Sequence, residues 1–285
     1  MEFFQVDVFA EAPYRGNPLA VFPDAEDLSP AQMQSIALEM NLSETSFITS
    51  VSDDSYDVRI FTPTDEMRFA GHPTIGTAWV LRRQGLVNED RLTQRSPVGE
   101  TTVTFEGDLV WLERQGNVEA DLETTDPQSV SLIATSLGIG PDEVGMEARE
   151  LGRSGRLRPA FSDGGLRQLM VPIKDADALG RCTLPVELSM AEMGVYGFTA
   201  TEAGSIRARG LWPGVGVPED PATGSAAAAL GLYLADRLGD IEFEITQGVE
   251  VGRPSRILVR AGKDQVRVGG HCLPIFTGRL EVLPS

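Results

Sequence analysis

The chain has 285 residues, 41% of them hydrophobic, which is enough for two domains with hydrophobic cores. Its formal net charge of −18 argues against nucleic acid or an anionic membrane as a partner, because both would be repelled. Its two cysteines, Cys182 and Cys272, have neither a CxxC spacing nor a set of histidines beside them. This disfavours a metal site or a disulfide framework, and a reducing, cytoplasmic location is expected.

The first 60 residues predict strands around one helix. The N-terminus alternates like a strand and carries an acid where a signal peptide needs bases. A helix is predicted over 29–40, with Ser29 as its N-cap and Gln32 completing a capping box. Gly, Asn and two prolines at 13–18 predict a turn. The strands are expected at 3–9, 19–22, 44–50 and 56–62.

One turn that opens a helix occurs twice. The segment His72-Pro73-Thr74-Ile75-Gly76-Thr77-Ala78 has the same spacing as Asp220-Pro221-Ala222-Thr223-Gly224-Ser225-Ala226. The turn recurs at an offset of 148 residues, and the motifs before and after it recur at offsets of 150 and 153. The repeat predicts two similar structural units joined in one chain. In this alignment His72 and Asp220 are equivalent.

Each copy of the turn leads into an apolar helix, predicted from His72 to about Arg83 and from Asp220 to about Arg237. Both helices are apolar around most of their circumference, so each is expected inside a sheet that wraps around it, in an α+β fold. The longest apolar stretch, 226–235, is too short to span a bilayer.

The predicted domains are 1–115 and 116–274, with 275–285 returning to the first and a linker around 115–126. Another helix is predicted from Asp126-Pro127 to near Gly138. The further strands are expected at 241–246, 256–260, 265–268 and 278–283.

The two repeated turns are candidate half-sites. Small residues there let a ligand approach free N–H groups at the positive end of a helix, which attracts a carboxylate or phosphate. We expect both turns to face one cleft between the halves and to bind a small anionic substrate. Taken singly, Asp220 is an ordinary N-cap and His72 a capping or packing histidine.

Glu44 is a third candidate, at the start of a predicted strand and flanked by Ser43 and Thr45. Partial burial there would raise its pKa toward the range that a general acid or base needs. A glutamate viewed singly is more often a surface carboxylate. A carboxylate facing an imidazole and a second carboxylate would form a set that moves protons.

Six sequence blocks together resemble the PhzF-like proteins of phenazine biosynthesis. The resemblance implies a diaminopimelate epimerase-like fold, with two pseudo-symmetric halves around central helices, and a homodimer. The blocks are Arg15-Gly16-Asn17-Pro18-Leu19-Ala20-Val21, Glu39-Met40-Asn41-Leu42-Ser43-Glu44-Thr45, Phe61-Thr62-Pro63, Phe69-Ala70-Gly71-His72-Pro73, Glu219-Asp220-Pro221-Ala222-Thr223-Gly224-Ser225-Ala226 and Gln247-Gly248-Val249-Glu250-Val251-Gly252-Arg253-Pro254-Ser255.

The same resemblance implies a cofactor-free, metal-free isomerase, whose founding activity converts trans-2,3-dihydro-3-hydroxyanthranilate to its ketone tautomer. Glu44 matches the acid/base that moves a proton between ring carbons. The residues expected around the substrate are His72, Asp220, Ser225 and Ser43. Gly71 and Gly224 are expected to line the pocket for the substrate carboxylate.

Two alternatives stay open at this point. Related epimerases and racemases of amino acids use two opposed thiols, but neither Cys182 nor Cys272 lies in a repeated turn. A non-catalytic small-molecule-binding protein would keep the cleft without turnover. The founding enzymes carry alanine where this chain has Pro221, so the natural substrate is left open.

Overall fold

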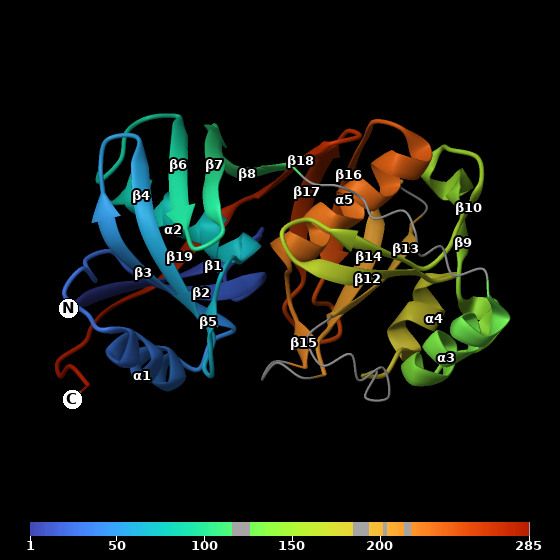
Figure 1. The fold of residues 1–285 in the computed structure, drawn as a ribbon, viewed down its shortest axis with the longest axis horizontal. Helices are drawn as coiled ribbons and strands as arrows, with labels where there is room; N and C mark the ends of the chain where they lie inside the picture. Colours follow the sequence, from blue (N-terminus) through green and yellow to red (C-terminus); the bar gives the residue numbers. More distant parts are fainter. Residues whose placement is uncertain (116–125, 185–193, 202–203, 214–217, 285) are drawn as a thin grey trace. The chain divides into compact units, whose positions relative to one another are not determined.

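The computed structural model describes residues 1–115, 126–184, 194–201, 204–213 and 218–284. The chain divides into two compact units (Figure 1). Unit 1 comprises Met1–Arg114 and Val268–Ser285, and unit 2 comprises Gln115–Arg267. The predicted linker lies almost entirely outside the described residues. No helix among those described is long and apolar enough to cross a membrane.

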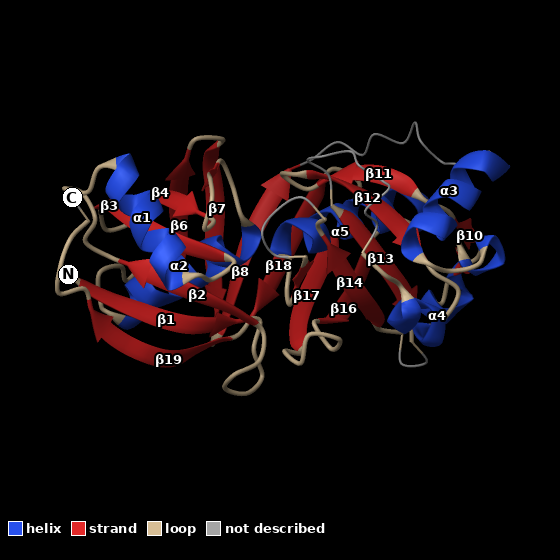
Figure 2. Ribbon diagram, turned by 90° about the horizontal axis from the view of Figure 1, so that it is seen from below, coloured by secondary structure: helices blue, strands red, loops and turns tan. Residues whose placement is uncertain are grey.

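Unit 1 is a sheet around one central helix, α2 (Gly71–Arg83). Its strands pair in the order β19, β1, β2, β3, β4, β6, β7 and β8, with the short β5 beside the end of β4. The pairs β2–β3 and β4–β6 are parallel, and the others are antiparallel. Figure 2 shows β19, β1 and β2 side by side. The strands are β1 (Glu2–Val8), β2 (Asn17–Phe22), β3 (Glu44–Val51), β4 (Ser55–Phe61), β5 (Glu66–Met67), β6 (Arg91–Ser96), β7 (Gly99–Glu106), β8 (Leu109–Gln115) and β19 (Cys272–Arg279).

The predicted first helix is α1 (Pro30–Met40), and its capping box is confirmed. The Gln32 N–H donates to Ser29 Oγ (3.3 Å), and the Ser29 N–H donates to Gln32 Oε1 (3.0 Å). The helix ends at Asn41, whose φ of 50° is left-handed and turns the chain toward β3. Because α1 packs into a core with Phe22, Phe47 and Phe61, the start of β3 is fixed.

Unit 2 repeats this plan around α5 (Gly224–Leu238). Its strands pair in the order β11, β12, β13, β14, β16 and β17, with the short β15 beside the end of β14. The pairs β12–β13 and β14–β16 are parallel, as in unit 1. The elements are α3 (Pro127–Leu137), η2 (Pro141–Glu143), β9 (Met146–Glu147), η3 (Ala148–Leu151), β10 (Arg156–Leu157), β11 (Ala160–Asp163), β12 (Arg167–Pro172), α4 (Ala176–Arg181), β13 (Val195–Ala200), β14 (Ile206–Leu211), β15 (Glu219–Asp220), β16 (Ile241–Gln247), β17 (Ser255–Ala261) and β18 (Gln265–Gly270).

Both central helices are buried, as predicted. Every residue of α5 from Gly224 to Ala235 is buried. The helices touch their sheets closely: a Cβ at Gly76 would lie 2.6 Å from Leu19 Cδ2, and one at Gly231 would lie 2.8 Å from Val259 Cγ1. The predicted α+β fold, with a sheet around each central helix, is therefore confirmed.

The register of the repeat differs from the predicted one. The two helices begin 153 residues apart, at Gly71 and Gly224, and Gln94 and Gln247 are separated by the same number. In this register His72 is equivalent to Ser225 rather than to Asp220.

The prediction that Asp220 opens the second helix was therefore wrong. Asp220 lies in β15, where it pairs with Gly210 of β14. Because Pro221 follows it, a helical conformation at Asp220 is disfavoured. The N-cap of α5 is Thr223 instead.

The last strand also lies earlier than predicted. Residues 278–283 were expected to pair with the first domain, but the pairing strand is β19 (Cys272–Arg279), antiparallel to β1. The chain leaves the strand just after it, where the Leu280 N–H donates to Met1 O (2.7 Å). The predicted helix near 126–138 is confirmed as α3, with Asp126 as N-cap and Gly138 as C-cap.

Candidate active site

In unit 1 the fold brings Glu44 and His72 together. Glu44 is the first residue of β3, opposite Leu19 of the parallel strand β2, and His72 is the second residue of α2. His72 Nε2 lies 3.5 Å from Glu44 Oε2. The side chains are 3% and 16% exposed, respectively. A carboxylate and an imidazole 28 residues apart in the sequence thus form one largely buried polar pair.

Asn17 is a further member of this cluster; the sequence placed it in a turn and in one of the six family blocks but gave it no role in the site. It is the first residue of β2 and is fully buried. Its Nδ2 lies 3.1 Å from His72 Nδ1. An asparagine in a Gly-Asn-Pro segment is typical of turns, so the local pattern gave no sign of this contact.

His72 is held in its neutral form. Burial lowers its pKa to about 3, because the charged imidazolium would lose its hydration without an adequate replacement. At neutral pH the imidazole therefore has one N–H and one lone pair, so its contact with Glu44 is not a full ion pair.

A buried hydrogen-bond network supports the N-terminal turn of α2. Gln94 of β6 donates through Nε2 to Thr74 Oγ1 (2.9 Å), and Tyr56 of β4 donates to Gln94 Oε1 (3.0 Å). Thr74 Oγ1 in turn donates to Ala70 O (2.9 Å). The network fixes the helix turn that carries His72.

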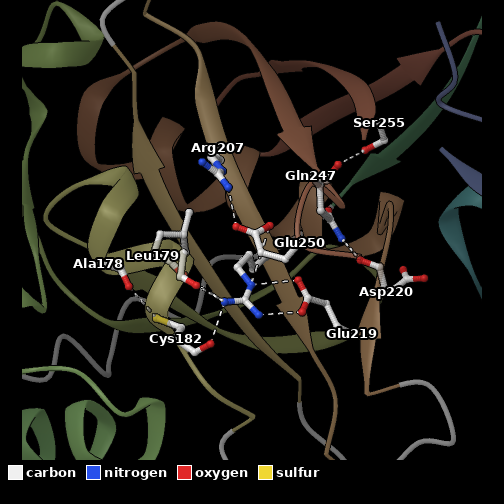
Figure 3. A network of polar contacts seen from close by, with 11 residues as sticks. Ala178, Leu179, Cys182, Arg207, Glu219, Asp220, Gln247, Glu250 and Ser255 are labelled. Carbon is white, nitrogen blue, oxygen red and sulfur yellow. Dashed lines mark hydrogen bonds and ion pairs between the residues drawn. The ribbon is translucent and has the colours of Figure 1, made fainter. Parts of the chain in front are cut away.

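The equivalent glutamine supports the Asp220 segment in unit 2 (Figure 3). Gln247 Nε2 donates to Asp220 O (2.7 Å) and to Thr223 Oγ1 (2.9 Å), and Gln247 Oε1 accepts from Tyr196 Oη (2.8 Å). Thr223 Oγ1 also lies 2.6 Å from Asp220 Oδ2 and donates to it. These contacts hold Asp220 beside the N-terminus of α5.

Glu219 anchors the other side of the same strand. Its carboxylate binds Arg209 in a bidentate pair, at 2.9 Å from Nε and 2.7 Å from Nη2. Arg209 Nη1 also donates to Leu179 O and Cys182 O at the end of α4. Figure 3 shows Glu219 directed into this cluster while its neighbour Asp220 projects away from it. Asp220 is therefore held by Gln247 and Thr223, while the neighbouring Glu219 is fixed by Arg209.

Ser225 occupies the helix position equivalent to His72. It is 4% exposed, and Gln168 Nε2 lies 3.4 Å from its Oγ. Gln168 belongs to β12, the strand of unit 2 that corresponds to β2. In each unit, therefore, a buried side-chain amide from the equivalent strand contacts the second residue of the central helix.

Both central helices begin without a capping side chain. The N-cap residues are Ala70 and Thr223, and neither makes a side-chain capping bond. Gly71 and Gly224 are the first helical residues, so a carboxylate can approach the first N–H groups closely. Ser43 directly precedes Glu44 and is partly buried.

The two cysteines lie elsewhere. Cys182 follows α4 and Cys272 begins β19, and both are buried. Burial raises the pKa of the Cys182 thiol to about 11, and it also raises the pKa of Cys272. Neither is a thiolate at neutral pH. The described residues contain no cluster of histidine, cysteine and acidic side chains that would hold a metal ion.

Comparison with known sequences shows strong similarity to isomerases. The model of the PhzC–PhzF family, phenazine biosynthesis-like proteins, matches residues 6–278. A trans-2,3-dihydro-3-hydroxyanthranilate isomerase of Pseudomonas fluorescens is 40% identical over 265 residues, covering 90% of this chain and 88% of the relative. An uncharacterized isomerase of Pasteurella multocida is 34% identical over 285 residues, covering 97% and 93%.

Solved structures share the fold. A PhzF-family protein of Bacillus anthracis matches with a TM-score of 0.83 at 24% identity, covering 99% of each chain. A hydroxyproline epimerase of Agrobacterium vitis matches with a TM-score of 0.61 at 13% identity, covering 98% of this chain and 91% of the epimerase. Fold and relatives together define an isomerase with a diaminopimelate epimerase-like fold. The chain belongs to the PhzC–PhzF family of phenazine biosynthesis-like proteins.

Proposed function

We propose that the protein moves a proton between two carbons of a small carboxylate-bearing substrate, without a cofactor, as trans-2,3-dihydro-3-hydroxyanthranilate isomerase does. The observation that carries this proposal is the pairing of Glu44 with His72 at 3.5 Å in a largely buried position. The 40% identity with the Pseudomonas fluorescens isomerase supports it.

Glu44 is the proton carrier in this proposal. Its carboxylate takes a proton from one carbon, and the electron pair of that C–H bond moves into the conjugated system of the substrate. The protonated Glu44 then returns the proton to another carbon, where a new C–H bond forms. The product is an isomer, and no oxidant or reductant is consumed. One group serves as base and then as acid, which a carboxyl group partly shielded from water can do.

His72 and Asp220 complete the proposed proton-moving set. The neutral His72 donates a hydrogen bond and so stabilises negative charge as it develops beside Glu44. Asp220, held by Thr223 and Gln247, accepts hydrogen bonds from polar substituents of the substrate.

The substrate carboxylate is assigned to the uncapped helix N-termini. Gly71 and Gly224 offer close access to backbone N–H groups, and Ser43 and Ser225 supply hydroxyl donors. We propose that the clusters of units 1 and 2 act on the same substrate, and that the protein works as a cytoplasmic homodimer.

The direct test is to incubate the purified protein with trans-2,3-dihydro-3-hydroxyanthranilate in heavy water and follow the ring protons by NMR. We expect conversion to the ketone tautomer. Because Pro221 replaces the alanine of the founding enzymes, related cyclic hydroxy- and amino-acids belong in the same panel. Binding of these compounds without turnover of any of them would contradict the proposal and favour a non-catalytic binding protein.

Amino-acid epimerisation is the alternative enzyme activity, and the same assay separates it. An epimerase would exchange the α-proton of free amino acids with deuterium from the solvent. We expect no such exchange by thiol chemistry, because both cysteines are buried and protonated at neutral pH.

A further inference from the structure

We propose that Asn17 is a positioning residue that holds His72 in the Nε2–H tautomer, so that the imidazole presents a hydrogen-bond donor to Glu44. The tautomer is a property of the folded chain. Its catalytic consequence rests on the function proposed above.

The first step of the argument is geometric. The two ring nitrogens of His72 face different partners: Nδ1 faces Asn17 Nδ2 at 3.1 Å, and Nε2 faces Glu44 Oε2 at 3.5 Å. His72 is 2% exposed and Asn17 is fully buried, so water does not compete for these positions. Nε2 makes no hydrogen bond to any other described residue, so Glu44 Oε2 is the polar atom that it faces.

The second step is the chemistry of the amide. An amide nitrogen donates hydrogen bonds and does not accept them, so Nδ1 must accept with its lone pair. A neutral imidazole that accepts at Nδ1 carries its hydrogen on Nε2. The same arrangement occurs in unit 2, where the Gln168 amide nitrogen faces Ser225, the residue equivalent to His72.

The third step concerns Glu44. A donor at Nε2 stabilises the ionised carboxylate and directs the buried oxygen Oε2 toward the imidazole. The second oxygen, Oε1, is then the one that exchanges a proton with the substrate. In the opposite tautomer two lone pairs, on Nε2 and on Oε2, would face each other, which would disfavour the ionised base.

The tautomer can be measured directly because the chain has only two histidines, His72 and His271. We would record long-range ¹H–¹⁵N correlations of the imidazoles at pH 7 and assign them with a His271→Gln variant. We expect His72 to show an unprotonated Nδ1 and a protonated Nε2. The Nδ1–H tautomer, or an imidazolium, in the wild-type protein would overturn the proposal, and this result does not require any variant to fold.

Asn17→Asp tests the role of the amide. A carboxylate at this position accepts hydrogen bonds, so His72 should switch to the Nδ1–H tautomer or gain a second proton, and kcat should fall at least about tenfold with a smaller change in KM. Asn88→Asp places the same charge on an exposed loop of unit 1. It should leave both the His72 tautomer and kcat unchanged.

Two outcomes of this comparison would overturn the proposal: an unchanged tautomer in Asn17→Asp, or a switched tautomer with full activity. If the wild-type protein turns over no compound in the panel, the proposed function fails while the NMR spectra still decide the tautomer.

Discussion

Folding favours the neutral form of His72, because burial lowers the pKa of its imidazole from 6.5 to about 3. Above pH 6.5 this shift has no effect on stability. As the pH falls below 6.5 the unfolded chain binds a proton that the folded chain does not, so the free energy of unfolding decreases until the pH reaches the folded pKa. The loss is at most about 1.4 kcal/mol per pH unit.

His72→Gln should therefore flatten the acid side of the stability curve. We expect the variant to lose less stability than the wild type between pH 6.5 and 4, by up to about 1.4 kcal/mol per pH unit. Urea unfolding at several pH values measures this difference. Parallel plots of unfolding free energy against pH for the two proteins would contradict the prediction, because they would mean that folding does not lower the pKa of His72.

At the residue scale, the sequence predicted Glu44 and His72 as candidates, and the structure places them side by side. Asn17 could not be predicted in the same way. Its segment is typical of a turn, and its contact with His72 depends on the packing of β2 against α2, which no local pattern encodes.

At the element scale, the N-termini of the two central helices are each held by an equivalent glutamine, Gln94 or Gln247, although the partners differ. In unit 1 the threonine lies inside the helix, as Thr74, whereas in unit 2 it is the N-cap, Thr223. A short strand, β5 or β15, precedes each central helix, and in unit 2 Gln247 also binds the carbonyl of Asp220 in β15.

Gln247→Leu should cost about 1–3 kcal/mol of stability, since it leaves the Tyr196 hydroxyl and the Asp220 carbonyl without their buried partner. It should also lower kcat, because Asp220 is no longer fixed. The control is Tyr196→Phe, which should cost about 1 kcal/mol while keeping the bonds from Gln247 to Asp220 and Thr223. Urea unfolding and steady-state kinetics separate the two effects. Equal kcat values for both variants would show that the Gln247 contacts do not position Asp220.

The sequence predicted both central helices from their apolar surface, but it misplaced the start of the second. Asp220-Pro221 has the composition of a helix N-terminus, and capping residues are common before proline. The pairing of Asp220 in β15 with Gly210 in β14 overrides this local preference. The start of the second helix is therefore decided by strand pairing, whereas the existence of the helix follows from its apolar residues.

At the scale of the whole molecule, duplication explains the fold. The two units share the same succession of parallel and antiparallel pairs, including the short strand before each central helix. The repeat was visible in the sequence because the helix turns and the glutamine motifs recur. Its register was not, because the offset varies from 148 to 153 residues between motifs and only the helix starts decide which value holds.

The duplicated scaffold carries different side chains in its two halves. The second helix position is His72 in one unit and Ser225 in the other, and Glu44, the first residue of β3, lies beside His72 in unit 1. A single carboxylate supported by a neutral imidazole, rather than two matched thiols, is therefore the feature on which the proposed proton transfer depends.

The turnover of Glu44→Gln tests this claim most directly. The amide keeps the shape of the carboxylate but does not carry a proton, so kcat should fall by about 10³-fold while substrate affinity and unfolding free energy stay close to those of the wild type. Glu39→Gln is the matched control, because it changes an exposed glutamate of α1 five positions earlier and should keep full activity. Full turnover by Glu44→Gln would contradict the account.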